Sequence, residues 1–176
     1  NHIKRRNGEN IGLISVMNYV NMRQTFESLI DYESEMLHEL MNNIPDTIYF
    51  KNAKKQFTLI NRAQAKLLGI KEINEAYGKT DFDFFKKEFA EKTSIDEDNI
   101  LGGGAPLIDK EELIEGNKGE RQWLSVTKNA IRDRKGKISG IVGISRDITQ
   151  RKEIQEQLEV AKVNAEKADK LKSSFL

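Results

Sequence analysis

Hydrophobic residues near the start of the chain recur with helical spacing, in a stretch that contains no Gly or Pro. They follow a 3-4 alternation that is interrupted at Glu33, at positions Tyr19, Met22, Phe26, Leu29, Met36 and Leu40. A similar alternation returns after Thr149, at Ile154, Leu158, Ala161, Ala165, Ala168, Leu171 and Phe175. Such stripes are typical of a two-stranded coiled coil or of a helix lying on a sheet, with a solvated surface helix as the alternative.

Between these helices, residues 42–147 alternate β-prone runs with short helical runs. The β-prone runs are residues 47–51, 56–61, 107–115, 121–131 and 138–146. The helical runs, 62–68 and 86–101, end at glycines, which commonly terminate helices. The order of two strands, then helices, then three strands predicts an α+β domain with a five-stranded antiparallel sheet.

The start of the chain also resembles its end. Residues 3–30 align without a gap on residues 131–158, each copy having a charged turn centred on Gly, an apolar run and a helical stretch. This spacing suggests tandem modules. We therefore expect a terminal hairpin of a preceding module in residues 1–18, a connecting helix in 19–41, a complete domain in 42–149 and a second connecting helix in 150–176. Two unrelated hairpins are the alternative.

Composition narrows the class of protein. The 29 Lys and Arg residues nearly balance the 28 Asp and Glu residues, which argues against a nucleic-acid or membrane-surface partner. The absence of cysteine excludes disulfides and thiolate sites, and it is compatible with a reducing compartment. No apolar run approaches the length of a membrane span. We expect a cytoplasmic location for this piece, with any membrane anchor lying outside it.

No motif in the sequence argues for catalysis or for a metal. Asp81 with Asp83, and Asp96 with Asp98, are paired carboxylates without a supporting His or Cys. We interpret them as helix caps and solvated charges. The glycines at 136, 140 and 143 lack the Lys-Ser or Lys-Thr pair of a phosphate loop. The fragment itself is therefore not expected to be an enzyme.

Several separated motifs together resemble a PAS sensor domain over about residues 41–152. They are NNIPDTIYFK, GKTDFDFF, the strand beginning at Trp123, and GIVGISRDITQRK. The last residues, AEKADKLKSSFL, resemble the first helix of the dimerisation and phosphoacceptor domain of sensor histidine kinases. The resemblance implies a two-component kinase of bacterial or archaeal type. The first module would be PAS-like, although residues 18–21 depart from the pattern of residues 146–149.

The resemblance implies a pocket between the sheet and its helices, occupied by a cofactor, a metabolite or side chains alone. Strand alternation places Trp123, Ser125 and Thr127 on one face, which we assign to the pocket. The pocket candidates are Ile48, Phe50, Phe85, Thr93, Ile100, Trp123, Ser125 and Thr127. Their hydroxyls predict a small, partly polar ligand of unknown identity. Flavin photochemistry would need a Cys, and His-ligated heme is disfavoured because the histidines are His2 and His38, outside the domain.

The junction between the last strand and the exit helix is the expected point of signal transfer. Asp147 or Thr149 can accept hydrogen bonds from the first N–H groups of the helix, and Gln150 stands where a capping box needs it. An ordinary helix cap is the alternative. In PAS sensors, this motif passes changes in the sheet to the output helix.

These features predict a sensory or relay module that forms a homodimer through its flanking helices and controls a kinase domain in the same chain. A PAS module of a cyclic-dinucleotide enzyme is one alternative, which the KLKSSFL tail disfavours. A spacer that dimerises without binding any ligand is the other.

Overall fold

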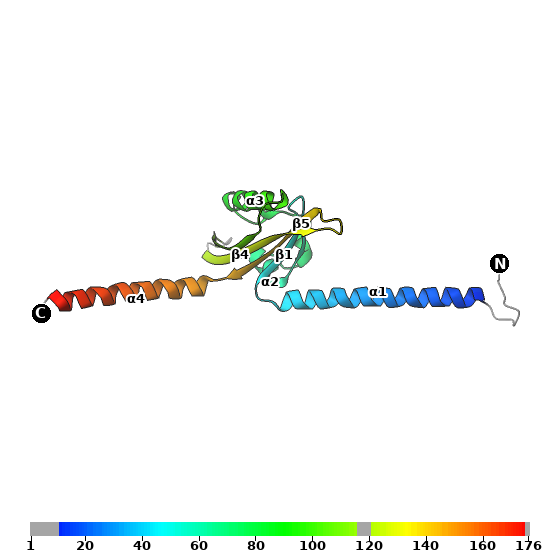
Figure 1. Ribbon diagram of the computed structural model, residues 1–176, viewed down its shortest axis with the longest axis horizontal. Helices are drawn as coiled ribbons and strands as arrows, with labels where there is room; N and C mark the ends of the chain where they lie inside the picture. Colours follow the sequence, from blue (N-terminus) through cyan, green and yellow to red (C-terminus); the bar gives the residue numbers. More distant parts are fainter. Residues whose placement is uncertain (1–10, 116–120, 175–176) are drawn as a thin grey trace. The chain divides into compact units, whose positions relative to one another are not determined.

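The computed structural model describes residues 11–115 and 121–174. Within them, five antiparallel strands form one sheet in the order β2-β1-β5-β4-β3 (Figure 1). The strands are β1 Thr47–Asn52, β2 Phe57–Ile60, β3 Leu107–Glu115, β4 Arg121–Arg132 and β5 Ile138–Asp147. The predicted α+β architecture with a five-stranded antiparallel sheet is confirmed, and the strand bounds agree within two residues.

Helices cover one face of this sheet, which we call the inner face. They are α2 Arg62–Leu68, the 3-10 turns η1 Ile73–Ala76 and η2 Asp81–Asp83, and α3 Lys87–Leu101. Helix α2 packs against β1, and α3 packs across β3, β4 and β5 (Figure 1). Two apolar clusters form the core beneath them, one around Phe57 and Leu68 and the other around Ile114 and Val126.

Asn61 explains why α2 starts where it does. Its side-chain Oδ1 accepts hydrogen bonds from Gln64 N at 2.9 Å and Ile48 N at 3.0 Å, so one side chain caps the helix and binds it to β1. The helix ends at Gly69, whose φ of 72° is readily adopted by glycine. These local signals are visible in the sequence, and the predicted bounds of α2 are confirmed.

The chain divides into two units, residues 1–43 and 44–176. The first contains α1 Ile11–Asn43, so the strand that we expected within residues 1–18 is wrong over residues 11–18. No Gly or Pro separates this apolar run from the helical stripe that follows, and the helix therefore extends through it. The hairpin turn predicted around Asn7-Gly8 lies outside the described residues.

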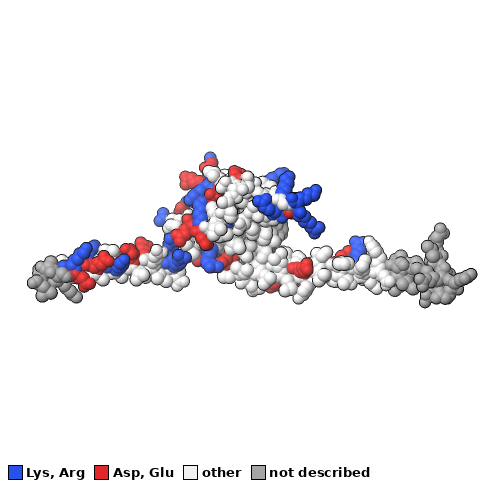
Figure 2. All heavy atoms as spheres, viewed as in Figure 1, with Lys and Arg blue, Asp and Glu red and all other residues white. Residues whose placement is uncertain are grey.

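The second unit ends in α4 Thr149–Ser174. Figure 2 shows acidic and basic residues interleaved along α4, whereas the visible face of α1 carries few charges. Both helices expose apolar side chains of the predicted stripes, including Phe26 and Leu40 in α1 and Ile154 and Leu158 in α4. Phe175 lies outside the described residues. In the part of the chain that the structure describes, no helix is long and apolar enough to span a bilayer.

Candidate functional site

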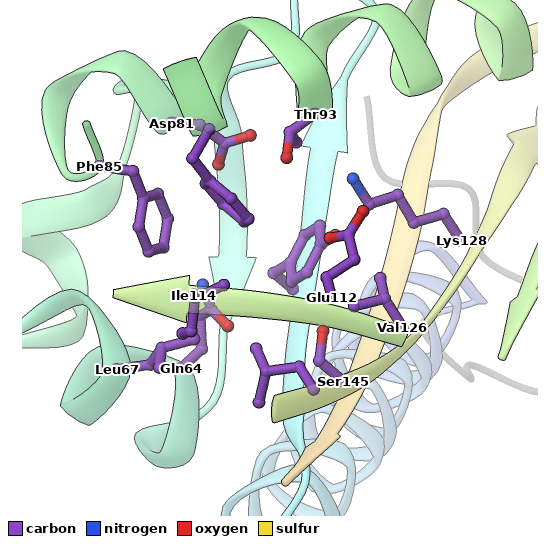
Figure 3. Close-up of a pocket in the computed structure, with 13 residues that line it drawn as sticks. Gln64, Leu67, Asp81, Phe85, Thr93, Glu112, Ile114, Val126, Lys128 and Ser145 are labelled. Carbon is purple, nitrogen blue, oxygen red and sulfur yellow. The ribbon is translucent and has the colours of Figure 1, made fainter. Parts of the chain in front are cut away.

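A cavity of about 30 Å³ lies between the inner face of the sheet and the helices (Figure 3). This volume accommodates about two water molecules. Its apolar lining consists of Leu67, Phe85, Phe89, Ile114, Leu124 and Val126. Its polar lining consists of Tyr49, Gln64, Asp81, Thr93, Glu112, Lys128 and Ser145. The polar groups come from the helices and from the strands, so both layers contribute to the chemistry of the site.

The structure corrects most of the pocket assignment. Of the eight predicted residues, Phe85 and Thr93 line the cavity. Strand β4 turns Leu124, Val126 and Lys128 toward it, so alternation places Trp123, Ser125 and Thr127 on the opposite face. The same alternation in β1 turns Tyr49 inward and places Ile48 and Phe50 on the other face. Ile100 is buried in α3 without lining the cavity.

The hydroxyl groups of β4 bind the neighbouring strand and are not turned toward the cavity. Ser125 Oγ donates a hydrogen bond to Asp109 Oδ1 at 3.2 Å, and Thr127 Oγ1 accepts one from Asp109 N at 3.2 Å. Asp109 has a positive φ of 50° and lies at an irregularity in the pairing of β3 with β4. Ser125 and Thr127 therefore stabilise a β-bulge, which explains hydroxyls on that face.

A buried ion-pair cluster lies beside the cavity. Lys51 Nζ is 2.6 Å from Asp81 Oδ2 and 2.6 Å from Glu97 Oε1. Lys128 Nζ lies 3.8 Å from Glu97 Oε1. All four side chains are less than a tenth exposed. We call these residues the buried cluster, and it connects β1 and β4 to η2 and α3.

Burial shifts the protonation equilibria of this cluster. Loss of hydration raises the pKa of Glu97, while Lys51 opposes that shift. Loss of hydration also lowers the pKa of Lys128, with Glu97 acting in the opposite direction. The pKa of Tyr49 is raised well above its ordinary value by burial and by the nearby carboxylates, first Glu97. Lys51 therefore helps Glu97 to remain charged in spite of its burial.

Further ion pairs hold α3 to the strands around the cavity. Lys110 of β3 pairs with Asp96, and its Nζ lies 3.0 Å from Glu112 Oε1. Lys55, in the turn between β1 and β2, lies 2.7 Å from Asp98 Oδ1. Charged contacts from β3 and from the turn between β1 and β2 thus converge on α3.

The predicted roles of the paired carboxylates are partly wrong. Asp83 accepts a hydrogen bond from Thr80 N at 2.7 Å, so its role as a cap is confirmed. Asp81 is instead buried against Lys51. Sequence reasoning missed this pair because the two residues are 30 positions apart and lie on different elements. The described residues contain no group of three or more potential ligands that could hold a metal ion.

The exit junction is where β5 continues into α4, and β4 holds it in place. Asp147 Oδ1 accepts a hydrogen bond from Thr149 N at 2.8 Å. Asp147 therefore accepts from the first N–H of α4, as one of the two options in the sequence predicted. Thr149 Oγ1 accepts a hydrogen bond from Trp123 N at 2.9 Å, and Ile148 N donates one to Trp123 O at 2.8 Å. The first turn of α4 is therefore bound to the backbone of β4.

Two further ion pairs lie at this junction. Lys152 of α4 pairs with Glu111 of β3, and its Nζ lies 5.0 Å from the centroid of the Trp123 ring. Arg146 donates two hydrogen bonds to Asp46 Oδ2, from Nε at 3.0 Å and from Nη2 at 2.9 Å. Asp46 directly precedes β1, so this pair joins the start of the sheet to its exit. The sequence alone does not indicate this ion pair, because its two residues become neighbours only through the pairing of Thr47 with Ser145.

His38 is not among the residues that line the cavity. His38 lies on α1 with its Nδ1 2.8 Å from Ser34 O, and it is exposed. This contact is local to the helix. His2 lies outside the described residues.

A family model and several known proteins are similar to this chain over most of its length. A family model described as PAS fold matches residues 41–153. The aerobic respiration control sensor protein ArcB of Escherichia coli is 29% identical over 131 residues, which are 74% of this chain and 17% of ArcB. Sporulation kinase C of Bacillus subtilis is 29% identical over 130 residues, 71% of this chain and 28% of the kinase. A diguanylate cyclase of Vibrio cholerae is 28% identical over 134 residues, 75% of this chain and 41% of the cyclase. The chain thus spans less than half the length of each relative.

Solved structures share the fold at lower identity. VqmA bound to DPO gives a TM-score of 0.57 at 22% identity, with 62% of this chain and 55% of VqmA covered. The PAS domain of a protein from Colwellia psychrerythraea gives a TM-score of 0.55 at 16% identity, with 66% of this chain and 97% of that domain covered. These likenesses concern the arrangement of the sheet and helices.

Proposed function

Because this chain belongs to the PAS fold family, we propose that it is the sensory or signal-relay module of a sensor histidine kinase. The observation that carries the proposal is the exit junction, where the first turn of α4 is bound to both β3 and β4. A change in the sheet therefore reaches α4 through fixed contacts. The histidine kinases among the relatives support the kinase as the output.

A series of contacts connects the cavity to α4 and could carry the signal. The cavity lies beside α3, whose Glu97 is paired with Lys51 of β1 and lies near Lys128 of β4. Strand β4 in turn binds Thr149 through the N–H of Trp123. A ligand in the cavity, or a movement of α1, would shift these strands and change the direction or packing of α4.

We further propose that the active form is a homodimer. Helices α1 and α4 expose large apolar side chains at their stripe positions, with Tyr19 62% exposed and Leu158 69% exposed. Such surfaces are typical of association sites, and a second copy of each helix would cover them. The charges along α4 suit the flanks of a coiled coil (Figure 2).

A cyclic-dinucleotide enzyme is the second candidate for the whole protein, because a diguanylate cyclase is among the relatives. Both outputs would use the same module and the same exit helix. A phosphorylatable His in a dimerisation helix would distinguish the kinase from the cyclic-dinucleotide enzyme. The ligand-free spacer differs from both in that it would dimerise without binding any molecule in the cavity.

Insertions in α4 test the relay in the longer protein. One Ala inserted between Ala161 and Lys162 rotates the following helix by about 100°, whereas seven inserted residues restore the register of a coiled coil. We expect the single insertion to change basal output strongly and the seven-residue insertion to retain output near that of the wild type. Equal output from both would contradict transmission through a dimeric helix.

A further inference from the structure

We propose that the cavity takes a small neutral molecule that donates an N–H or O–H hydrogen bond to the side-chain carbonyl of Gln64. A cyclic amide is the chemical class that fits best. This inference rests on the proposed sensory function and specifies the ligand chemistry of that site.

Gln64 carries the inference. It lies on α2, lines the cavity and is 3% exposed. Its backbone N–H is bound to Asn61, but its Oε1 is buried without a hydrogen-bond partner. Among the described residues, it is the one buried side-chain nitrogen or oxygen in this condition. Buried polar groups are nearly always paired, so the unpaired carbonyl marks a place for a donor.

No neighbouring side chain among the described residues supplies that donor. Figure 3 shows Gln64 beside Leu67 at the end of the cavity next to α2, with Ile114 close to them. Asp81 and Thr93 lie at the other end, beside η2 and α3 (Figure 3). The two labelled side chains next to Gln64, Leu67 and Ile114, are hydrocarbon, and its Oε1 has no partner, so a bound molecule or water would supply the donor.

The charges around the cavity favour a neutral occupant. Asp81 already accepts from Lys51, and Glu112 already pairs with Lys110. Lys128 has Glu97 as a nearby counter-charge. An ionised ligand would add a buried charge without a partner, which is strongly unfavourable.

The remaining lining favours a small ring. Leu67, Phe85, Phe89, Leu124 and Val126 present apolar surface, which suits a flat unsaturated body. A carboxamide side chain offers both an acceptor and a donor. A cyclic amide matches both, because its N–H can donate to Oε1 while its carbonyl accepts from Nε2 of the same residue.

The present volume of the cavity predicts how such a molecule enters. About 30 Å³ is too small for a ring, so the wall has to move. Phe85 and Phe89 pack against each other with their ring centroids 4.9 Å apart, and both are only partly buried. Displacement of this pair would enlarge the cavity and disturb the start of α3.

Three matched probes test the hydrogen bond by NMR titration of the isotope-labelled chain. 2-Pyridone carries an N–H donor and a carbonyl, N-methyl-2-pyridone keeps the carbonyl without the donor, and benzene has neither. We expect 2-pyridone to shift the resonances of Leu67, Phe85 and Ile114 and to bind about tenfold more tightly than N-methyl-2-pyridone, as expected for one lost hydrogen bond to a buried group.

Variants at position 64 test whether Gln64 causes the preference for 2-pyridone. Gln64→Leu and Gln64→Met should each bind the two pyridones with equal affinity, whereas Gln155→Leu, an exposed glutamine on α4, should keep the tenfold preference. The proposal is overturned if benzene binds the wild type as well as 2-pyridone does, if no probe shifts the cavity residues, or if the folded Gln64 variants keep the preference. These results would leave the effect of α4 insertions unchanged, so they are distinguishable from failure of the relay itself.

Discussion

The buried cluster and the exit junction are both built from ion pairs and hydrogen bonds, but they differ in exposure. Lys51 and Glu97 are each 1% exposed at their side chains, whereas Arg146 is 70% exposed. Breaking a buried pair leaves a charge without hydration, while an exposed group exchanges its partner for water. The buried cluster should therefore dominate the stability of the domain, and the exit junction should dominate its communication.

The largest effect is expected for Lys51→Met. The change leaves Asp81 and Glu97 buried without the ammonium that both of them contact, and it should lower the free energy of unfolding by about 3–5 kcal/mol. Urea denaturation would measure this loss.

Lys55→Met is the matched control, because Lys55 also contacts a serine and an aspartate of α3. Asp98 is 65% exposed, so this variant should lose only about 0–1 kcal/mol. Similar losses in the two lysine variants would mean that burial does not distinguish these ion pairs.

A smaller effect, visible in its pH dependence, is expected for Lys128→Met. The folded-state pKa of Lys128 is lowered from 10.5, so between the two values the unfolded state binds more protons. The wild type should therefore gain stability relative to the variant as the pH rises from the folded pKa toward 10.5. Urea denaturation over this range measures the difference. Lys54→Met, at an exposed position, should follow the wild type, and a Lys128→Met curve parallel to the wild type would contradict the pKa assignment.

The separation of contacting residues along the chain explains which features could be predicted from the sequence. Local signals determine α2 and β3, because Asn61, Gly69 and the alternating residues of β3 lie within or next to the elements that they specify. The buried cluster instead joins residues 30 and 46 positions apart, and no local pattern pairs them.

The inner face of β4 was assigned wrongly for the same reason. From residue type alone, Lys128 is expected at the surface and Trp123 in the core. Their true positions depend on Glu97 and on the first turn of α4, where Lys152 lies over the Trp123 ring. The predicted junction residue Asp147 was easier to find because its partner, Thr149, is only two positions away.

The smallest effect on stability is expected for Arg146→Ala. The guanidinium is mostly exposed, so water can replace its contact with Asp46, and the melting temperature should change little. Arg132→Ala is the matched control, since Arg132 is exposed and makes its contact within the turn between β4 and β5. A loss comparable to that of Lys51→Met would show that the junction is part of the structural core.

If the proposed sensor histidine kinase is the full-length protein, the most direct test of the contrast is its ratio of kinase to phosphatase output when it carries Asp147→Ala. The change removes a cap worth about 1 kcal/mol, so the domain should remain folded while the exit junction loosens. Asp133→Ala is the control, because Asp133 accepts backbone hydrogen bonds from Lys135 and Lys137 in a turn away from the junction. We predict that Asp147→Ala shifts the ratio and that Asp133→Ala leaves it unchanged. A wild-type ratio in Asp147→Ala would contradict the role of this junction in signal transfer.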